Sequence, residues 1–106
     1  MHFVLFYDIV DNFAEKRIPF RAKHLAKVRA SHDAGKLILA GALANPLDGA
    51  MLVFRGPTAD AAENFAKSDP YVTSGLVTNW RVREWGTVIG DGATMPSFSD
   101  ATGFRE

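Results

Sequence analysis

The chain has 106 residues, of which 47% are hydrophobic and 23% are charged, the balance of a single ordinary globular domain. Its 12 basic and 12 acidic residues cancel, which argues against a nucleic-acid-binding protein and against a polybasic membrane-surface module. There is no cysteine, so disulfides, thiolate nucleophiles and cysteine-based zinc sites are excluded.

The first part of the chain predicts a strand, a helix and a second strand. Residues 3–9 are rich in aliphatic and aromatic side chains, and Asp8 interrupts this run too early for a signal peptide or a membrane span. We therefore expect a cytoplasmic protein without a membrane partner. Residues 17–34 predict a helix that stops at Gly35, and residues 36–43 predict the second strand. The apolar stripe of this helix is predicted at Ile18, Ala22, Leu25, Arg29 and His32, flanked by Val28.

The middle of the chain predicts a hairpin and a second helix. The turn formers of residues 45–49 connect to a third strand at residues 50–55. Thr58 is the predicted N-cap of a helix that runs to about Lys67. Asp69-Pro70 predicts the end of that helix, because a residue before proline disfavours the α conformation.

The last part predicts one long strand and a tail. Residues 76–88 form the strand, on which Trp80 and Trp85 point to opposite faces. After this strand the composition shifts to glycine, serine, threonine and proline. The domain is predicted over residues 1–89, with a C-terminal tail at residues 90–106.

The element order βαββαβ predicts an α+β, ferredoxin-like fold, with a four-stranded antiparallel sheet and two helices on one face. Both faces of the strands are apolar, since Phe6 opposes Leu5, and Ile38 opposes Leu37 and Leu39. Two helices cover only one face. We predict that the other face packs against a second copy in a homodimer. The alternative is a ligand pocket covered by the tail.

Catalysis without cysteine falls to residues such as histidine, aspartate and tyrosine. His24 lies at the edge of the predicted buried face, where a titratable group is partly desolvated but reachable by a ligand. Taken alone, a helical histidine is more often structural, and Asp69 before proline is more often a turn residue. If the two helices meet on one face, His24 and Asp69 form a pair in which a carboxylate orients an imidazole for proton transfer. His2 is expected to be solvated, and His32 to have a structural role at the helix end.

The sequence has no metal or nucleotide motif. His24 and His32 are eight residues apart rather than four, and there is no HExxH motif or compact acidic cluster. Gly41 and Gly49 match no phosphate-loop spacing. We therefore expect no metal and no cofactor.

Several short motifs in combination resemble the YciI-like (YCII-related) family, over about residues 2–88. The resemblance implies a ferredoxin-like fold, two subunits packed sheet to sheet as a dimeric α/β barrel, and a His–Asp pair as the proposed active site. The matching positions are His24 and Asp69. The motifs are Arg21-x-x-His24-Leu25, Gly35-x-Leu37-x-x-Ala40-Gly41, Gly49, Asp69-Pro70-Tyr71, Gly75-Leu76 and Arg83-Glu84-Trp85.

The resemblance also implies a kind of chemistry. One branch of the family resembles a dehydrochlorinase of a chlorinated hydroxyquinol, and relatives with the same barrel include muconolactone isomerases and cofactor-free monooxygenases. Their common thread is proton transfer on a small, often aromatic or enolisable molecule. This chain has Gly41-Ala42 where many members have Gly-Pro, which is expected to reshape the pocket rim.

The leading hypothesis is a small lyase or isomerase without metal or organic cofactor. His24 is its general base or acid, Asp69 the orienting partner, and Arg21 the residue for an anionic substrate group. Tyr7 and Tyr71 are predicted to line the pocket. A second hypothesis is a homodimer that binds a small metabolite, or acts as an interaction module, without chemistry. A third is a haem-dependent relative with His24 as the axial ligand.

Overall fold

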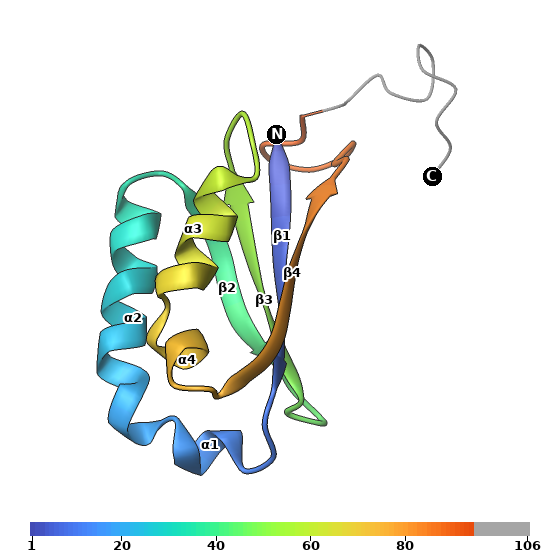
Figure 1. The fold of residues 1–106 in the computed structure, drawn as a ribbon. Coiled ribbons are helices and arrows are strands. Elements are labelled where there is room, and N and C mark those ends of the chain that lie inside the picture. The colour runs from blue at the N-terminus through green and yellow to red at the C-terminus, as the bar shows by residue number, and fades with distance from the viewer. Residues whose placement is uncertain (95–106) are drawn as a thin grey trace.

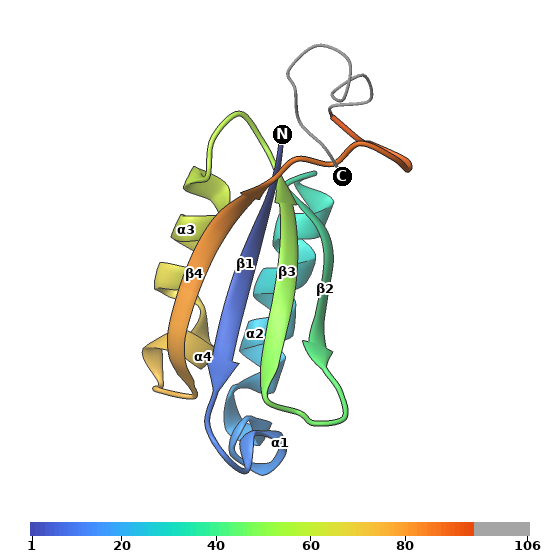
Figure 2. The same cartoon turned by 90° about the vertical axis from the view of Figure 1, so that its right-hand side faces the viewer.

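The computed structural model describes residues 1–94 as a sheet covered by helices on one face. The strands are β1 (His2–Ile9), β2 (Leu37–Leu43), β3 (Gly49–Arg55) and β4 (Val77–Trp85). They lie in the order β2-β3-β1-β4, and each neighbouring pair is antiparallel. The helices are α1 (Phe13–Lys16), α2 (Ile18–Asp33), α3 (Asp60–Ser68) and α4 (Pro70–Thr73). Figures 1 and 2 show these helices on the same side of the sheet.

This arrangement confirms the predicted α+β, βαββαβ fold of ferredoxin-like type. The crossover through α2 joins β1 to β2, and the crossover through α3 joins β3 to β4. Each crossover skips one strand, so β1 and β3 become the inner strands. Of the predicted tail at residues 90–106, the part from residue 95 onward lies outside the described residues. Within residues 1–94, no helix is long and apolar enough to cross a membrane.

The core lies between the sheet and the helices. Alternate residues of the inner strands face the helices, and Leu5 of β1 pairs there with Leu52 of β3. Leu5 and Phe54 are 0% and 1% exposed, and each such side chain stabilises the fold by roughly 1.5–3 kcal/mol on burial. Phe65 of α3 covers the strands, with its ring centroid 5.5 Å from that of Phe54.

The other side of the sheet is apolar, as predicted, and we call it the open face. Trp85 lies on this face and is 50% exposed, whereas Trp80 packs against the core, as their opposite orientations predict. Leu37 and Leu39 were predicted to share a face, and this is wrong, because they are 3% and 70% exposed. The β2–β3 register shifts between them, and the extra residue reverses the alternation of side chains. The apolar residues of the open face are Val4, Phe6, Leu39, Leu43, Met51, Val53 and Trp85, and β4 adds Arg81 and Arg83 to the same face.

The predicted stripe of α2 is also wrong. The Ile18 residue is 70% exposed and the His32 side chain is 65% exposed. Phe20 and Val28 pack against the core instead, and His24 lies between them at four-residue spacing. A polar residue is stable at this central position because a partner on another element accepts its hydrogen bond. The spacing of apolar residues along the sequence cannot predict such a partner.

The chain makes a short helix after α3 that was not predicted. As expected for a residue before proline, Asp69 is extended, with φ −67° and ψ 127°, and α3 ends at Ser68. Pro70 then starts α4, since a missing N–H costs nothing in the first turn. Asp69 caps this helix by accepting a hydrogen bond from the Tyr71 N–H at 3.1 Å.

Two local predictions are corrected by the structure. The N-cap of α3 is Ala59, not Thr58. Thr58, one residue before the N-cap, accepts a 3.3 Å hydrogen bond from the Asp60 N–H. His2 was expected to be solvated but is 7% exposed. It is held in β1 between β3 and β4, and its Nδ1 lies 2.6 Å from the hydroxyl oxygen of Thr87.

Candidate active site

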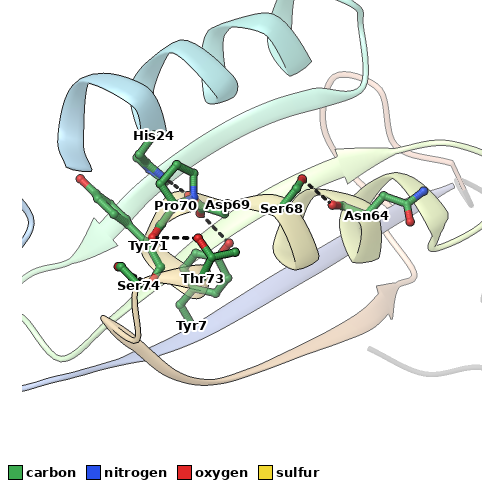
Figure 3. A network of polar contacts seen from close by, with 9 residues as sticks. All are labelled: Tyr7, His24, Asn64, Ser68, Asp69, Pro70, Tyr71, Thr73 and Ser74. Atoms are coloured by element: carbon green, nitrogen blue, oxygen red, sulfur yellow. Dashed lines mark hydrogen bonds and ion pairs between the residues drawn. The ribbon is translucent and has the colours of Figure 1, made fainter.

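Asp69 is the centre of a buried hydrogen-bond network where α2, β1 and α4 meet (Figure 3). Its residue is 0% exposed. One carboxylate oxygen, Oδ2, accepts from the Tyr7 hydroxyl at 2.7 Å. The other, Oδ1, accepts from His24 Nδ1 at 2.8 Å and from the Tyr71 N–H at 3.1 Å. A buried carboxylate is costly unless it is hydrogen-bonded, and donors from these separate elements satisfy Asp69.

The contact with Asp69 fixes the tautomer and the orientation of His24. A carboxylate only accepts hydrogen bonds, so Nδ1 carries a proton and Nε2 has the free lone pair when the ring is neutral. The imidazole stacks on Tyr71 with centroids 3.8 Å apart and planes at 11°. Phe65 meets it edge-on, with centroids 6.4 Å apart. These contacts lock the ring with Nε2 turned away from Asp69.

A cavity of about 250 Å³ lies beside the imidazole. The His24 side chain is 13% exposed, and within residues 1–94 it makes its side-chain hydrogen bond through Nδ1. No buried side-chain nitrogen or oxygen in this part of the chain lacks a partner, so Nε2 is accessible. The lining consists of Tyr7, Phe13, Arg17, Arg21, His24, Leu25, Val28, Ala40, Gly41, Ala42, Ala50, Leu52 and Tyr71.

The structure brings together the residues that the sequence singled out, but they lie at different positions relative to the cavity. His24, Arg21, Tyr7 and Tyr71 line the cavity. Asp69 lies behind His24 and does not line it, so it acts on a ligand only through the imidazole. Tyr7 directs its hydroxyl to Asp69, which makes it part of the support of the carboxylate.

Sequence reasoning missed Arg17 and Phe13, which also line the cavity. A signal existed, because Arg17, Arg21, Leu25 and Val28 follow one another at steps of four, four and three residues. This row lies along one side of α2, beginning at its N-cap Arg17, but the predicted stripe included only Leu25 of it, with Val28 at the flank. Phe13 lies in α1, which the sequence did not predict.

The Gly41-Ala42 pair, which is expected to reshape the pocket rim, lies at the cavity. Ala40, Gly41 and Ala42 of β2 contribute to the lining. The expected effect on the pocket rim is therefore located at the candidate site itself.

Both tyrosines of the site keep their hydroxyl protons near neutral pH. Burial raises the pKa of Tyr7 far above its ordinary value, and the negative charge of Asp69 and the hydrogen bond to it raise the pKa further. Burial also raises the pKa of Tyr71, while the positive charges of Arg17 and Arg21 act in the opposite direction. Tyr7 is thus a permanent donor to Asp69 in the neutral range.

The size of the cavity bears on the haem hypothesis. Sites for drug-sized ligands have volumes of roughly 300–1,000 Å³. The cavity of about 250 Å³ beside His24 is smaller than these, so its volume gives the haem hypothesis no support. The site as it stands fits a ligand of one small ring.

Comparison with known proteins gives this geometry a family. The model of the YCII-related domain matches residues 1–86. The chain belongs to the YCII-related domain family. The resemblance predicted from the sequence motifs over residues 2–88 is thereby confirmed. Its curated relatives include protein YciI of Escherichia coli O6:H1 and an uncharacterized protein of Haemophilus influenzae, each 28% identical over 98 residues, which is 84% of this chain and 100% of theirs.

A solved structure of similar fold is that of the 5-chloro-2-hydroxyhydroquinone dehydrochlorinase TftG from Burkholderia phenoliruptrix, in complex with 2,5-dihydroxybenzoquinone. The TM-score is 0.68 and the sequence identity is 21%, over 82% of this chain and 95% of that one. At this identity the likeness establishes the fold alone. It does not extend to a substrate.

Proposed function

We propose that this YCII-related protein is an enzyme that moves a proton on a small molecule bound in the cavity, with His24 as general base and acid. The observation that carries the proposal is the 2.8 Å contact between His24 Nδ1 and the fully buried Asp69, next to a cavity that the imidazole lines. Asp69 is a positioning residue, since it orients the imidazole and stabilises its protonated form.

In the proposed step, the lone pair of His24 Nε2 takes a proton from a C–H bond next to a carbonyl group. The electron pair of that bond forms an enolate, and the carboxylate of Asp69 balances the charge of the imidazolium. Return of the proton to another carbon gives an isomerisation. Departure of a leaving group such as chloride with its electron pair gives a lyase reaction. The step uses groups of the chain itself.

The lyase branch has a counterpart of the same fold. TftG is named as a dehydrochlorinase, and loss of hydrogen chloride includes removal of a proton by a base. In this chain His24 is the lining residue best suited to be that base, because Tyr7 and Tyr71 hold their protons at neutral pH. We therefore favour enolisable and halogenated ring compounds as substrates.

The test is a screen for proton exchange at carbon. The full chain is incubated in heavy water with small enolisable acids, lactones and chlorinated hydroquinones, and NMR follows the loss of C–H signals while chloride release is measured in parallel. Removal of a general base lowers a rate by about 10²–10⁴-fold. His24→Gln is expected to lower exchange by this amount, and Asp69→Asn is expected to lower it by impairing the orientation of the ring.

His32→Gln is the matched control, because His32 lies on the same helix with its side chain 65% exposed. Its exchange rates are expected to equal those of the wild type. Full activity in His24→Gln would contradict the proposal. Exchange of no compound by the wild type would leave the homodimeric metabolite-binding or interaction module as the function.

We also propose that the open face is covered by a second copy of the chain in a homodimer. Leu39 is 70% exposed and Trp85 50% exposed on this face, and a hollow of about 330 Å³ lies over Phe6 and Met51. Sheet faces with this much apolar surface are normally covered. A two-fold pairing of identical faces covers both at once, and it matches the sheet-to-sheet dimer that the family resemblance implies.

Sedimentation of two variants tests the homodimer. Leu39→Glu places a charge in the proposed interface and is expected to raise the dimer Kd by at least about tenfold, because an unpaired buried charge is costly. Ile18→Glu is the control, since Ile18 is also 70% exposed but lies on α2, away from the open face. Equal association of both variants, or a monomeric wild type, would contradict the dimer.

A further inference from the structure

We propose that the cavity takes a small planar carboxylate, whose negative group is held by the guanidinium groups of Arg17 and Arg21. This inference deepens the proposed function, on which it rests in using the same cavity, by naming the class of substrate. It also assigns a binding role to Arg17, which the sequence did not indicate.

The charge of the residues that line the cavity favours an anionic ligand. Arg17 and Arg21 lie one helical turn apart and line the same cavity, whereas no aspartate or glutamate lines it. Among the ion pairs formed within residues 1–94, neither guanidinium takes part in one. Two guanidinium groups that form no ion pair within this part of the chain and line one small cavity are a site for a carboxylate, whose two oxygens accept hydrogen bonds from such donors.

The guanidinium group of Arg17 is connected to His24 through a row of aromatic rings. The Cζ atom of Arg17 lies 5.5 Å from the ring centroid of Phe13, and the Phe13 ring lies 5.2 Å edge-on from Tyr71. Tyr71 in turn stacks on His24 at 3.8 Å, so a row of rings links the guanidinium to the imidazole. Figure 3 shows the Tyr71 hydroxyl pointing away from Asp69. The charges of Arg17 and Arg21 lower the pKa of that hydroxyl while the charge of Asp69 raises it, so both guanidinium groups act on the same ring that stacks on His24.

The size and polarity of the remaining surface also bear on the ligand. The volume of about 250 Å³ holds one ring or a short conjugated chain. Away from the arginines, His24 and the two tyrosines, the lining is apolar and contains small side chains, with Ala40, Ala42 and Ala50 among them. A flat hydrocarbon body fits this surface. With its carboxylate at the arginines, such a molecule presents its other end to His24 Nε2.

The test is a titration of the full chain by NMR at low salt with benzoate, benzamide and phenyl phosphate. Benzamide has the shape of benzoate without its charge. Benzoate is expected to bind at least about tenfold more tightly than benzamide, and Arg17→Gln and Arg21→Gln are each expected to weaken benzoate binding about tenfold. Benzamide binding stays unchanged in both variants. Arg29→Gln is the control, because Arg29 is exposed on α2 and does not line the cavity.

The outcomes separate this inference from the proposed function. Equal affinities for benzoate and benzamide overturn it, even if His24 exchanges protons on neutral compounds. Tighter binding of phenyl phosphate than of benzoate overturns the choice of a carboxylate. A preference for benzoate that persists in His24→Gln and is lost in the arginine variants supports it, whether or not any compound undergoes proton exchange.

Discussion

Replacement of Tyr7 by phenylalanine removes one hydroxyl from the network around Asp69 and leaves the ring in place. The Tyr7 residue is 3% exposed, so the remaining ring still fills the core. The Oδ2 atom of Asp69 loses its 2.7 Å donor, while Oδ1 keeps His24 and the Tyr71 N–H. Because Asp69 is 0% exposed, water cannot replace the lost donor without opening the core.

A hydrogen bond to a charged group contributes about 1.5–3 kcal/mol, and a buried acceptor left without a partner places the loss in the upper part of this range. We expect Tyr7→Phe to lower the free energy of unfolding by about 2–3 kcal/mol. For a domain of about 100 residues this corresponds to a melting temperature lower by roughly 8–24 °C. Urea unfolding at neutral pH measures the change directly.

Tyr71→Phe is the matched control for this substitution. The Tyr71 hydroxyl points away from Asp69 in Figure 3, and Tyr71 contacts Asp69 through its backbone N–H. Its loss is expected to change stability by less than about 0.5 kcal/mol. If Tyr7→Phe cost no more than Tyr71→Phe, Tyr7 would not be the support of the carboxylate, and the account of the site would be wrong.

The pH dependence of stability is a second test of the contact between Tyr7 and Asp69. The folded state raises the pKa of Tyr7 above its ordinary value near 10, mainly by burial. The folded chain therefore keeps a proton that the unfolded chain releases above about pH 10, so this contribution is complete below that pH and is lost as the pH rises. The loss is at most about 1.4 kcal/mol per pH unit. Tyr7→Phe lacks this loss, so its stability is expected to approach that of the wild type in alkaline solution.

Two other residues allow shorter predictions. Gly49→Ala is expected to destabilise the sheet by about 1–3 kcal/mol in urea unfolding, because a Cβ atom there would lie 2.8 Å from the Tyr7 carbonyl oxygen. Gly41→Ala is its control, since a Cβ atom at Gly41 would meet no atom within 4 Å. Equal effects of the two substitutions would refute the close approach. Burial lowers the pKa of His2, and the positive charges of the N-terminus and Arg55 lower it further. The unfolded chain therefore binds a proton at a pH where the folded chain does not, and stability falls as the pH drops through about 6.5. His2→Gln is expected to flatten this slope between pH 7 and 5, and an unchanged slope would show that other groups cause it.

The element order could be predicted because local signals agree with the global fold. Gly35 is a good example, since it ends α2 with φ 78°, as its place after the helix predicts. The details that could not be predicted depend on contacts between elements. The bulge before Leu39 is one of these, because nothing in the run of apolar residues of β2 marks the extra residue.

The candidate site was predictable in part. His24 and Asp69 are 45 residues apart, and local reasoning alone favoured a structural histidine and a turn aspartate. The family motifs selected the pair, and the fold places the two side chains in contact. The support from Tyr7 was not predictable, because its hydroxyl reaches Asp69 across the sheet–helix interface. Arg17 was overlooked because the phase of the helix was misjudged.

The most direct test of the central claim is NMR of the imidazole nitrogens of His24 in the full chain, at a pH where the ring is neutral. The account predicts that Nδ1 carries the proton toward Asp69 and that Nε2 is unprotonated, with this preference lost in Asp69→Ala. A proton on Nε2 in the wild type, or an identical tautomer in Asp69→Ala, would contradict the claim that Asp69 sets His24 up as the base of this site.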